Sequence, residues 1–196
     1  MKSDALKEAA AFAETIGAPA LQPSIAYGSH FLSESPCYVG YLTREQPEVR
    51  AALSKYDLMI VLGADPIRMS VYSEIDPMPD GLKMVQVGLV DWDLAKNYPA
   101  EMAVRADVRE TLKALIPLLE KKGGAKMKER TKKRLAEIAP QNWSAKREKL
   151  VAAIEGRKSA KPIDVDLLSL RLVQSLPKDA IVVNEGLTTS RRIADL

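Results

Sequence analysis

Apolar positions in the first 121 residues follow two patterns, helical spacing and short continuous runs. Leu6, Ala9, Ala13 and Ile16 share one face of a helix, which we expect Ser3 or Asp4 to cap and Gly17 to end. The run over 58–62, stopped by a glycine, is typical of a strand covered on both faces. The predicted elements are, in order, helix 6–16, strand 20–22, loop 23–40, helix 47–56, strand 58–62, strand 83–88, one or two helical turns within 92–98, strand 102–104 and helix 108–121.

Strands that alternate with helices through short connections indicate a parallel sheet covered by helices. We therefore predict a doubly wound, Rossmann-like α/β domain over residues 1–121. The chain opens on a helix, so we expect this domain to lack its first strand.

The remaining residues predict a linker and the start of another domain. Residues 122–161 are expected to form a basic helical linker. Residues 162–196 predict a helix over 163–176, a strand over 180–183, a turn at 184–186 and a helix from 188 to the end. Such a short piece cannot bury its own apolar faces, so we expect it to be the beginning of a second α/β unit.

Composition is that of an ordinary soluble protein, with 46% apolar and 28% charged residues in 196. The net charge of +3 hides an asymmetry, since residues 121–161 carry 14 Lys or Arg and only 4 Asp or Glu. Apolar residues recur at helical spacing within this block, which favours a connector of amphipathic helices. Nucleic-acid binding is the alternative, and its affinity would fall steeply with salt, but aromatic stacking residues are sparse.

The chain offers little material for an independent catalytic centre. Its one cysteine, Cys37, excludes an internal disulfide, and its one histidine, His30, forms only a weak candidate pair with that thiol. We expect Cys37 to be a small buried hydrophobe. No apolar run is long enough to span a bilayer, and the first residues are unlike a signal peptide, so we expect a cytoplasmic protein without membrane contact.

Two features hint at nucleotide binding. Gly63 follows a strand but lacks the further glycines of a dinucleotide fingerprint, so a tight turn explains it as well. Asp91 and Asp93 follow the strand at 83–88, where an acidic residue can hold a ribose or cap a helix. A ligand crevice would lie at residues 63–68 and 88–93.

Several landmarks, taken in order, resemble the central domain of thiamine diphosphate-dependent enzymes. They are residues 13–19 at a helix end, the loop Ser35-Pro36-Cys37-Tyr38, the run 56–63, Val85-Gln86-Val87, and residues 97–112. The segment 62–68 and the Pro-Cys loop resemble benzoylformate decarboxylase in particular, within a group that includes acetolactate synthase. Residues 184–189 resemble a loop of the diphosphate-binding domain that runs beside the cofactor.

The resemblance implies a piece of a 2-keto acid decarboxylase or carboligase that acts as scaffold and subunit contact. It implies Glu185, Thr188 and Thr189 as cofactor-binding residues and assigns no catalytic or metal residue here. Thiamine diphosphate and Mg²⁺ belong to the complete enzyme, whose activating glutamate and metal motif have no counterpart in this chain, so we expect it to be inactive alone. Ser35 stands where benzoylformate decarboxylase has an active-site histidine, and Ser cannot titrate near neutral pH.

The same family also suggests what the chain contacts. Its partners would be other domains or subunits of the parent enzyme, in a homo-oligomer, and not nucleic acid. Relatives bind FAD (acetolactate synthases) or ADP (oxalyl-CoA decarboxylases) in the central domain, so a nucleotide-binding module is the second hypothesis.

Overall fold

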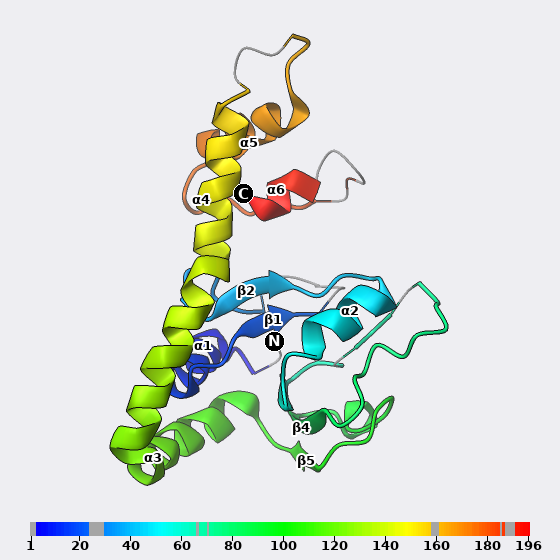
Figure 1. Ribbon diagram of the computed structural model, residues 1–196, viewed down its shortest axis with the longest axis vertical. Helices are drawn as coiled ribbons and strands as arrows, with labels where there is room; N and C mark the ends of the chain where they lie inside the picture. Colours follow the sequence, from blue (N-terminus) through cyan, green and yellow to red (C-terminus); the bar gives the residue numbers. More distant parts are fainter. Residues whose placement is uncertain are drawn as a thin grey trace. The chain divides into compact units, whose positions relative to one another are not determined.

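The computed structural model describes residues 3–23, 30–65, 67–69, 71–157, 161–184, 186 and 191–196. The chain divides into two compact units, Met1–Asn142 and Trp143–Leu196, which we treat separately (Figure 1). The predicted division at residues 121 and 161 into domain, linker and second domain stays a prediction.

The first unit alternates helices with strands. Its elements are α1 (Leu6–Ile16), β1 (Ala20–Gln22), β2 (Tyr38–Tyr41), α2 (Gln46–Leu53), β3 (Leu58–Leu62), β4 (Lys83–Gly88), a 3₁₀ turn (Asp91–Asp93), β5 (Met102–Arg105), α3 (Val108–Ile138) and a second 3₁₀ turn (Ala139–Gln141). The second unit contains α4 (Trp143–Glu155), α5 (Val165–Ser175) and α6 (Arg191–Asp195).

Every strand pair in the described residues is parallel, which confirms the predicted α/β class. One sheet has the order β3-β4-β5, with Ile60 opposite Val85 and Val85 opposite Met102. A separate two-stranded sheet pairs β1 with β2. Strand β2 lies partly within the predicted loop 23–40. Sequence reasoning missed it because that stretch holds two prolines, two glycines and four serines, a composition typical of a loop.

The main core lies between α1, α3 and β4. Ala9 and Phe12 of α1 pack against Val108 and Leu112 of α3 and against Val87 of β4. On each helix these side chains lie three or four positions apart, so they form one apolar stripe that faces the other helix. A second core, made of Leu42, Val49, Leu53 and Ile67, lies around α2.

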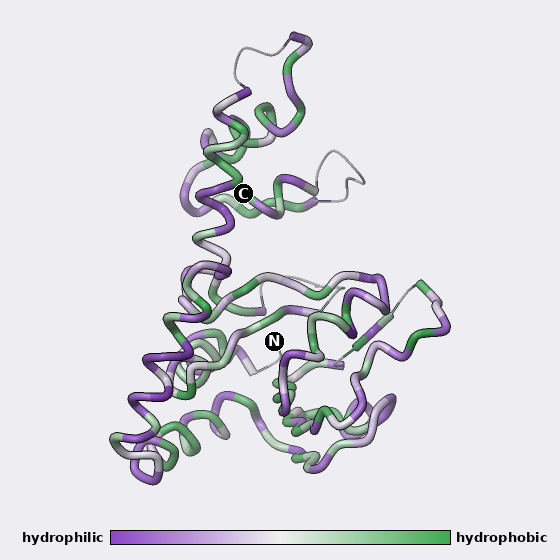
Figure 2. Tube along the Cα trace, in the orientation of Figure 1, coloured by the Kyte–Doolittle hydropathy of each residue, from purple (hydrophilic) through white to green (hydrophobic). Residues whose placement is uncertain are grey.

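Helix α3 extends well past its predicted end at residue 121. It continues to Ile138 across a kink at Gly124, whose φ of 52° and ψ of −149° are not helical. Beyond the kink, Met127 and Ile138 are buried, whereas the lysines and arginines between them are exposed. Figure 2 shows that hydrophilic residues recur along this part of α3. This basic stretch is therefore helical, with its charged side chains exposed.

Three local predictions were wrong. Neither Ser3 nor Asp4 caps α1, because its N-cap is Ala5. The Ser3 hydroxyl instead accepts from the Val108 amide at 3.2 Å, and the Asp4 carboxylate forms an ion pair with Arg109. Strand β3 is not covered on both faces, since Leu58 is 45% exposed. Residues 180–183 form no strand, because the described chain offers them no strand partner, and Ile181 is 92% exposed.

No helix in the described part of the chain is both long and apolar enough to cross a membrane.

The carboxyl end of α1 is joined to the second half of α3. Gly17 ends α1 in the left-handed conformation (φ 62°). The Thr131 hydroxyl donates to the Thr15 carbonyl at 2.9 Å, and the Arg134 guanidinium donates to the Ile16 carbonyl at 3.3 Å. Carbonyls that a helix end leaves without intrahelical partners are thus satisfied by another helix.

We predict that Gly17→Ala lowers the free energy of unfolding more than Gly81→Ala does. Both glycines have positive φ, which costs an L-residue about 1–2 kcal/mol. A Cβ at Gly17 would also lie 3.0 Å from the Thr131 carbonyl oxygen, whereas one at Gly81 meets nothing within 4 Å. Urea unfolding measures both, and equal losses would show that the α1–α3 contact is not tight.

Candidate functional site

The carboxyl ends of β3 and β4 bring two glycine turns together, where parallel sheets usually bind ligands. The Gly63 amide donates to the Val87 carbonyl at 2.8 Å, with Gly63 at φ 64°. A Cβ on Gly88 would lie 3.9 Å from the Gly63 Cα and 3.7 Å from Leu94. The two turns therefore approach each other so closely that little room is left between them.

Gln86 holds this edge of the sheet together. Its side chain, 1% exposed, donates from Nε2 to the carbonyls of Ala64 (3.2 Å) and Asp93 (2.9 Å), and its Oε1 accepts from the Ala95 amide (2.7 Å). Sequence reasoning assigned no role to Gln86. The available signal was a polar residue inside an otherwise apolar strand, since buried polar side chains need partners.

The cavity at this edge has a volume of about 80 Å³, and Ser3, Gly63, Gln86 and Asp93 are among its lining residues. Pockets that hold drug-sized ligands measure roughly 300–1,000 Å³. The described residues therefore do not fit FAD or ADP at this edge, because the cavity is too small and Gln86 spends its polar atoms on neighbouring backbone groups.

One of the two acidic candidates at this edge, Asp91, has a side-chain partner, whereas Asp93 contributes its backbone carbonyl. Asp91 forms an ion pair with Arg105 at 3.0 Å, and both side chains are largely exposed. The Asp93 carbonyl accepts from Gln86. The 3₁₀ turn begins after Val90 and has no side-chain cap, so the alternative prediction that these residues cap a helix was wrong.

The loop that precedes β2 places Ser35 against α1. The Ser35 hydroxyl donates to Glu14 Oε1 at 2.7 Å and accepts from the Cys37 amide at 3.4 Å. With Ser35 buried and its hydroxyl bonded to Glu14, this side chain holds the loop to the helix. Its contacts are those of a structural residue.

Cys37 is fully buried, as predicted for a small hydrophobe. Burial raises the pKa of its thiol to about 12, and the nearby Glu14 carboxylate contributes in the same direction. Burial also lowers the pKa of His30. A protonated, inaccessible thiol cannot act as a nucleophile, so the candidate Cys37–His30 pair is not a catalytic dyad.

The predicted cofactor-binding residues Glu185, Thr188 and Thr189 lie outside the described residues. Beside them, the Gly186 amide donates to Asn184 Oδ1 at 3.0 Å, which makes a local turn. Among the described residues, no group of three or more His, Cys, Asp or Glu side chains could hold a metal ion. The described residues thus form no complete site for either thiamine diphosphate or its Mg²⁺.

Comparison with known proteins identifies the family. Residues 1–115 match the thiamine pyrophosphate enzyme central domain, and the chain belongs to this family. No match was found among curated proteins.

Three solved structures are similar in fold. A protein from Mycobacterium smegmatis described as a thiamin diphosphate-dependent enzyme matches with a TM-score of 0.55 and 28% identity, over 60% of this chain and 22% of its own. The 4-hydroxybenzoylformate decarboxylase of Rhodococcus jostii RHA1 matches with a TM-score of 0.67 and 20% identity, over 98% of this chain and 33% of its own. Benzoylformate decarboxylase from Polynucleobacter necessarius matches with a TM-score of 0.72 and 20% identity, over 99% of this chain and 33% of its own.

The two decarboxylases, at 20% identity, establish the fold alone. This chain spans between a fifth and a third of the length of these three structures. The predicted resemblance to the central domain of thiamine diphosphate-dependent enzymes is confirmed.

We predict that Gln86→Met lowers the free energy of unfolding by about 2–3 kcal/mol, because three part-buried hydrogen bonds, to backbone groups of Ala64, Asp93 and Ala95, are lost. Gln141→Met is the matched control, since Gln141 is exposed and donates to the Glu137 carbonyl of its own helix end. Urea unfolding of both variants measures the difference. A loss below 0.5 kcal/mol for Gln86→Met, within the usual range for surface substitutions, would mean that these hydrogen bonds do not hold the sheet edge.

We predict that the Cys37 thiol does not react with a disulfide reagent at pH 8 in the folded chain and reacts fully in urea. The folded thiol ionises at a pKa of about 12 against an ordinary 9.0, so its contribution to stability is intact below pH 9 and is lost as pH rises toward 12. Rapid reaction of the folded chain at pH 8 would contradict the buried position.

Proposed function

We propose that this chain is a scaffold and subunit-contact piece of a thiamine diphosphate-dependent 2-keto acid decarboxylase or carboligase, inactive by itself. Membership of the central-domain family over residues 1–115 carries the proposal. Two structural neighbours, a 4-hydroxybenzoylformate decarboxylase and a benzoylformate decarboxylase, support the 2-keto acid class.

The chemistry of such an enzyme resides in its cofactor, which supplies the carbanion stabilisation that follows loss of CO₂. The role proposed for this chain is to help bind that cofactor, through Glu185, Thr188 and Thr189. The Ser35 hydroxyl, bonded to Glu14, moves no proton near neutral pH. Mg²⁺ and the glutamate that activates the cofactor would come from other parts of the enzyme.

The proposed partners are further domains or subunits of that enzyme, arranged in a homo-oligomer. Surface composition supports this. Val165, Leu168 and Leu172 recur on one face of α5 and are about half exposed, and Ile181 and Val183 are almost entirely exposed. An apolar helix face that is left exposed is typical of a protein interaction site.

A nucleotide-binding role is the weaker candidate. The cavity of about 80 Å³ at the sheet edge does not support FAD or ADP there.

We predict no turnover when the purified chain is assayed with benzoylformate and with pyruvate in the presence of thiamine diphosphate and Mg²⁺. Release of CO₂ measured by a coupled assay tests this, and a complete enzyme of the family serves as the positive control. Clear turnover by the chain alone would contradict the proposal.

A further inference from the structure

Strand β3 lies at an open edge of the sheet β3-β4-β5, because no strand among the described residues pairs with its other side. The Asp57 carbonyl and the Gly63 amide bond to β4, so the odd-numbered residues of this stretch turn their backbone groups toward β4. Backbone groups of successive residues alternate between the two sides of a strand. The amides and carbonyls of Leu58, Ile60 and Leu62 therefore face the open edge.

Apolar side chains line both faces of this edge. Ile60 and Leu62 pack against the core between α1 and α3, whereas Met59 packs against the core around α2, as does Leu21 of β1. Leu58, at the start of β3, is about half exposed. A strand that added to this edge would lie between two apolar layers, so it would have to be apolar on both faces.

Residues 58–62 carry none of the features that protect an open strand edge. Edge strands of natural proteins usually contain a charged residue, a proline or a bulge, which prevents another chain from pairing with them. The sequence Leu-Met-Ile-Val-Leu contains no charge and no proline, and its register with β4 is continuous. By contrast β5, at the opposite edge, ends on Arg105, which is charged and pairs with Asp91. The β3 edge is therefore the one suited to receive a further strand.

Residues 180–183 of the second unit have the composition that this edge requires. Their sequence, Ala-Ile-Val-Val, is apolar throughout, and its β-branched residues favour an extended strand. Ile181 and Val183 are almost entirely exposed, and no described strand pairs with the segment. The described part of the chain thus contains both an open strand edge and an apolar segment without a strand partner.

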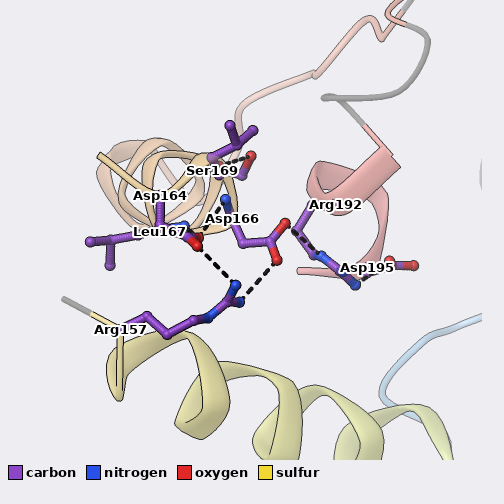
Figure 3. Close-up of polar contacts among 8 residues, drawn as sticks. Arg157, Asp164, Asp166, Leu167, Ser169, Arg192 and Asp195 are labelled. Atoms are coloured by element: carbon purple, nitrogen blue, oxygen red, sulfur yellow. Dashed lines mark hydrogen bonds and ion pairs between the residues drawn. The ribbon is translucent and has the colours of Figure 1, made fainter. Parts of the chain in front are cut away.

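The unit that carries this segment is itself folded. Asp164 caps α5 by accepting from the Asp166 amide at 2.9 Å, and Leu170 of the same helix is fully buried. The Asp166 carboxylate accepts from Arg157, after the end of α4, at 2.9 Å and from Arg192 of α6 at 3.0 Å (Figure 3). The exposed segment therefore belongs to a unit with its own packing and ion pairs.

We propose that residues 180–183 of one copy of this chain add as a parallel strand to the β3 edge of a second copy. The inference rests on the homo-oligomer of the proposed function and deepens it by naming the two surfaces that meet. Strand addition pairs the main-chain groups of the edge and buries the side chains of the added segment. Two copies that exchange the segment reciprocally form a closed dimer in which each β3 edge is covered.

The first test measures self-association of the 196-residue chain by analytical ultracentrifugation over a range of concentrations. Wild type should form a dimer in a concentration-dependent way. Ile181→Lys should weaken the dimer about tenfold, the factor expected when one isoleucine no longer enters an apolar interface. Because Ile181 is almost entirely exposed, this variant should fold as wild type does. Ile163→Lys is the matched control, since Ile163 is also largely exposed but lies outside the segment, and it should leave the dimer unchanged.

A second measurement, amide hydrogen exchange, reports strand pairing itself. The Ile60 amide faces the open edge, so it should exchange rapidly in dilute solution and become protected as the dimer forms. The Val61 amide faces β4 and should be protected at every concentration, which makes it the internal control. In Ile181→Lys the Ile60 amide should stay unprotected at concentrations at which wild type is dimeric.

The outcomes separate this inference from the function on which it rests. A dimer that leaves the Ile60 amide unprotected, or that Ile163→Lys weakens as much as Ile181→Lys does, would overturn strand addition while the homo-oligomer stands. Protection of Ile60 in a monomer would show that the segment pairs within its own chain, and would overturn the role of the second copy. A chain that stays monomeric with Ile60 unprotected would overturn both the inference and the homo-oligomer.

Discussion

The first unit depends on the contact between α1 and α3. Each helix has one apolar stripe, and the two stripes meet over β4 through Phe12, Val108 and Leu112. Beyond that core, Thr131 and Arg134 satisfy the last carbonyls of α1, and Gly17 lets the chain turn away where a Cβ would crowd the Thr131 carbonyl at 3.0 Å. The basic second half of α3 is thereby held to the folded core, which explains how a helix rich in like charges remains ordered.

The sheet edge illustrates how this unit serves as a scaffold. In parallel α/β proteins the carboxyl ends of the strands are the usual ligand site. Here Gln86 uses both of its polar atoms to join Ala64, Asp93 and Ala95, and the glycine turns lie against each other. The groups that could bind a nucleotide are thus bonded within the protein, and the proposed function accordingly places cofactor contact in the second unit.

Much of the fold could be predicted from the sequence because periodicity reports burial directly. Helix α1, strands β1, β3, β4 and β5, and helices α2 and α5 lie close to their predicted positions. The errors have physical causes. Strand β2 contains Gly40 and follows a proline, the continuation of α3 crosses a non-helical Gly124, and residues 180–183 would need a strand partner that the described chain does not offer.

Less of the candidate site could be predicted. Gln86 acts through contacts with residues distant in the sequence, and the bond between Ser35 and Glu14 spans 21 positions, so no local motif marks either one. The arginine pairs of Asp166 are likewise a consequence of tertiary structure. The cofactor residues Glu185, Thr188 and Thr189 remain predictions from family resemblance.

The central claim is that this chain carries part of a cofactor-binding scaffold without the metal anchor that makes cofactor binding tight in a complete enzyme. Calorimetric titration with thiamine diphosphate, with and without Mg²⁺, tests it most directly. The account predicts weak binding whose affinity changes less than about twofold, equivalent to about 0.4 kcal/mol, when Mg²⁺ is added. Tight binding that requires Mg²⁺ would show that the chain assembles its own metal–diphosphate site, and would contradict the account.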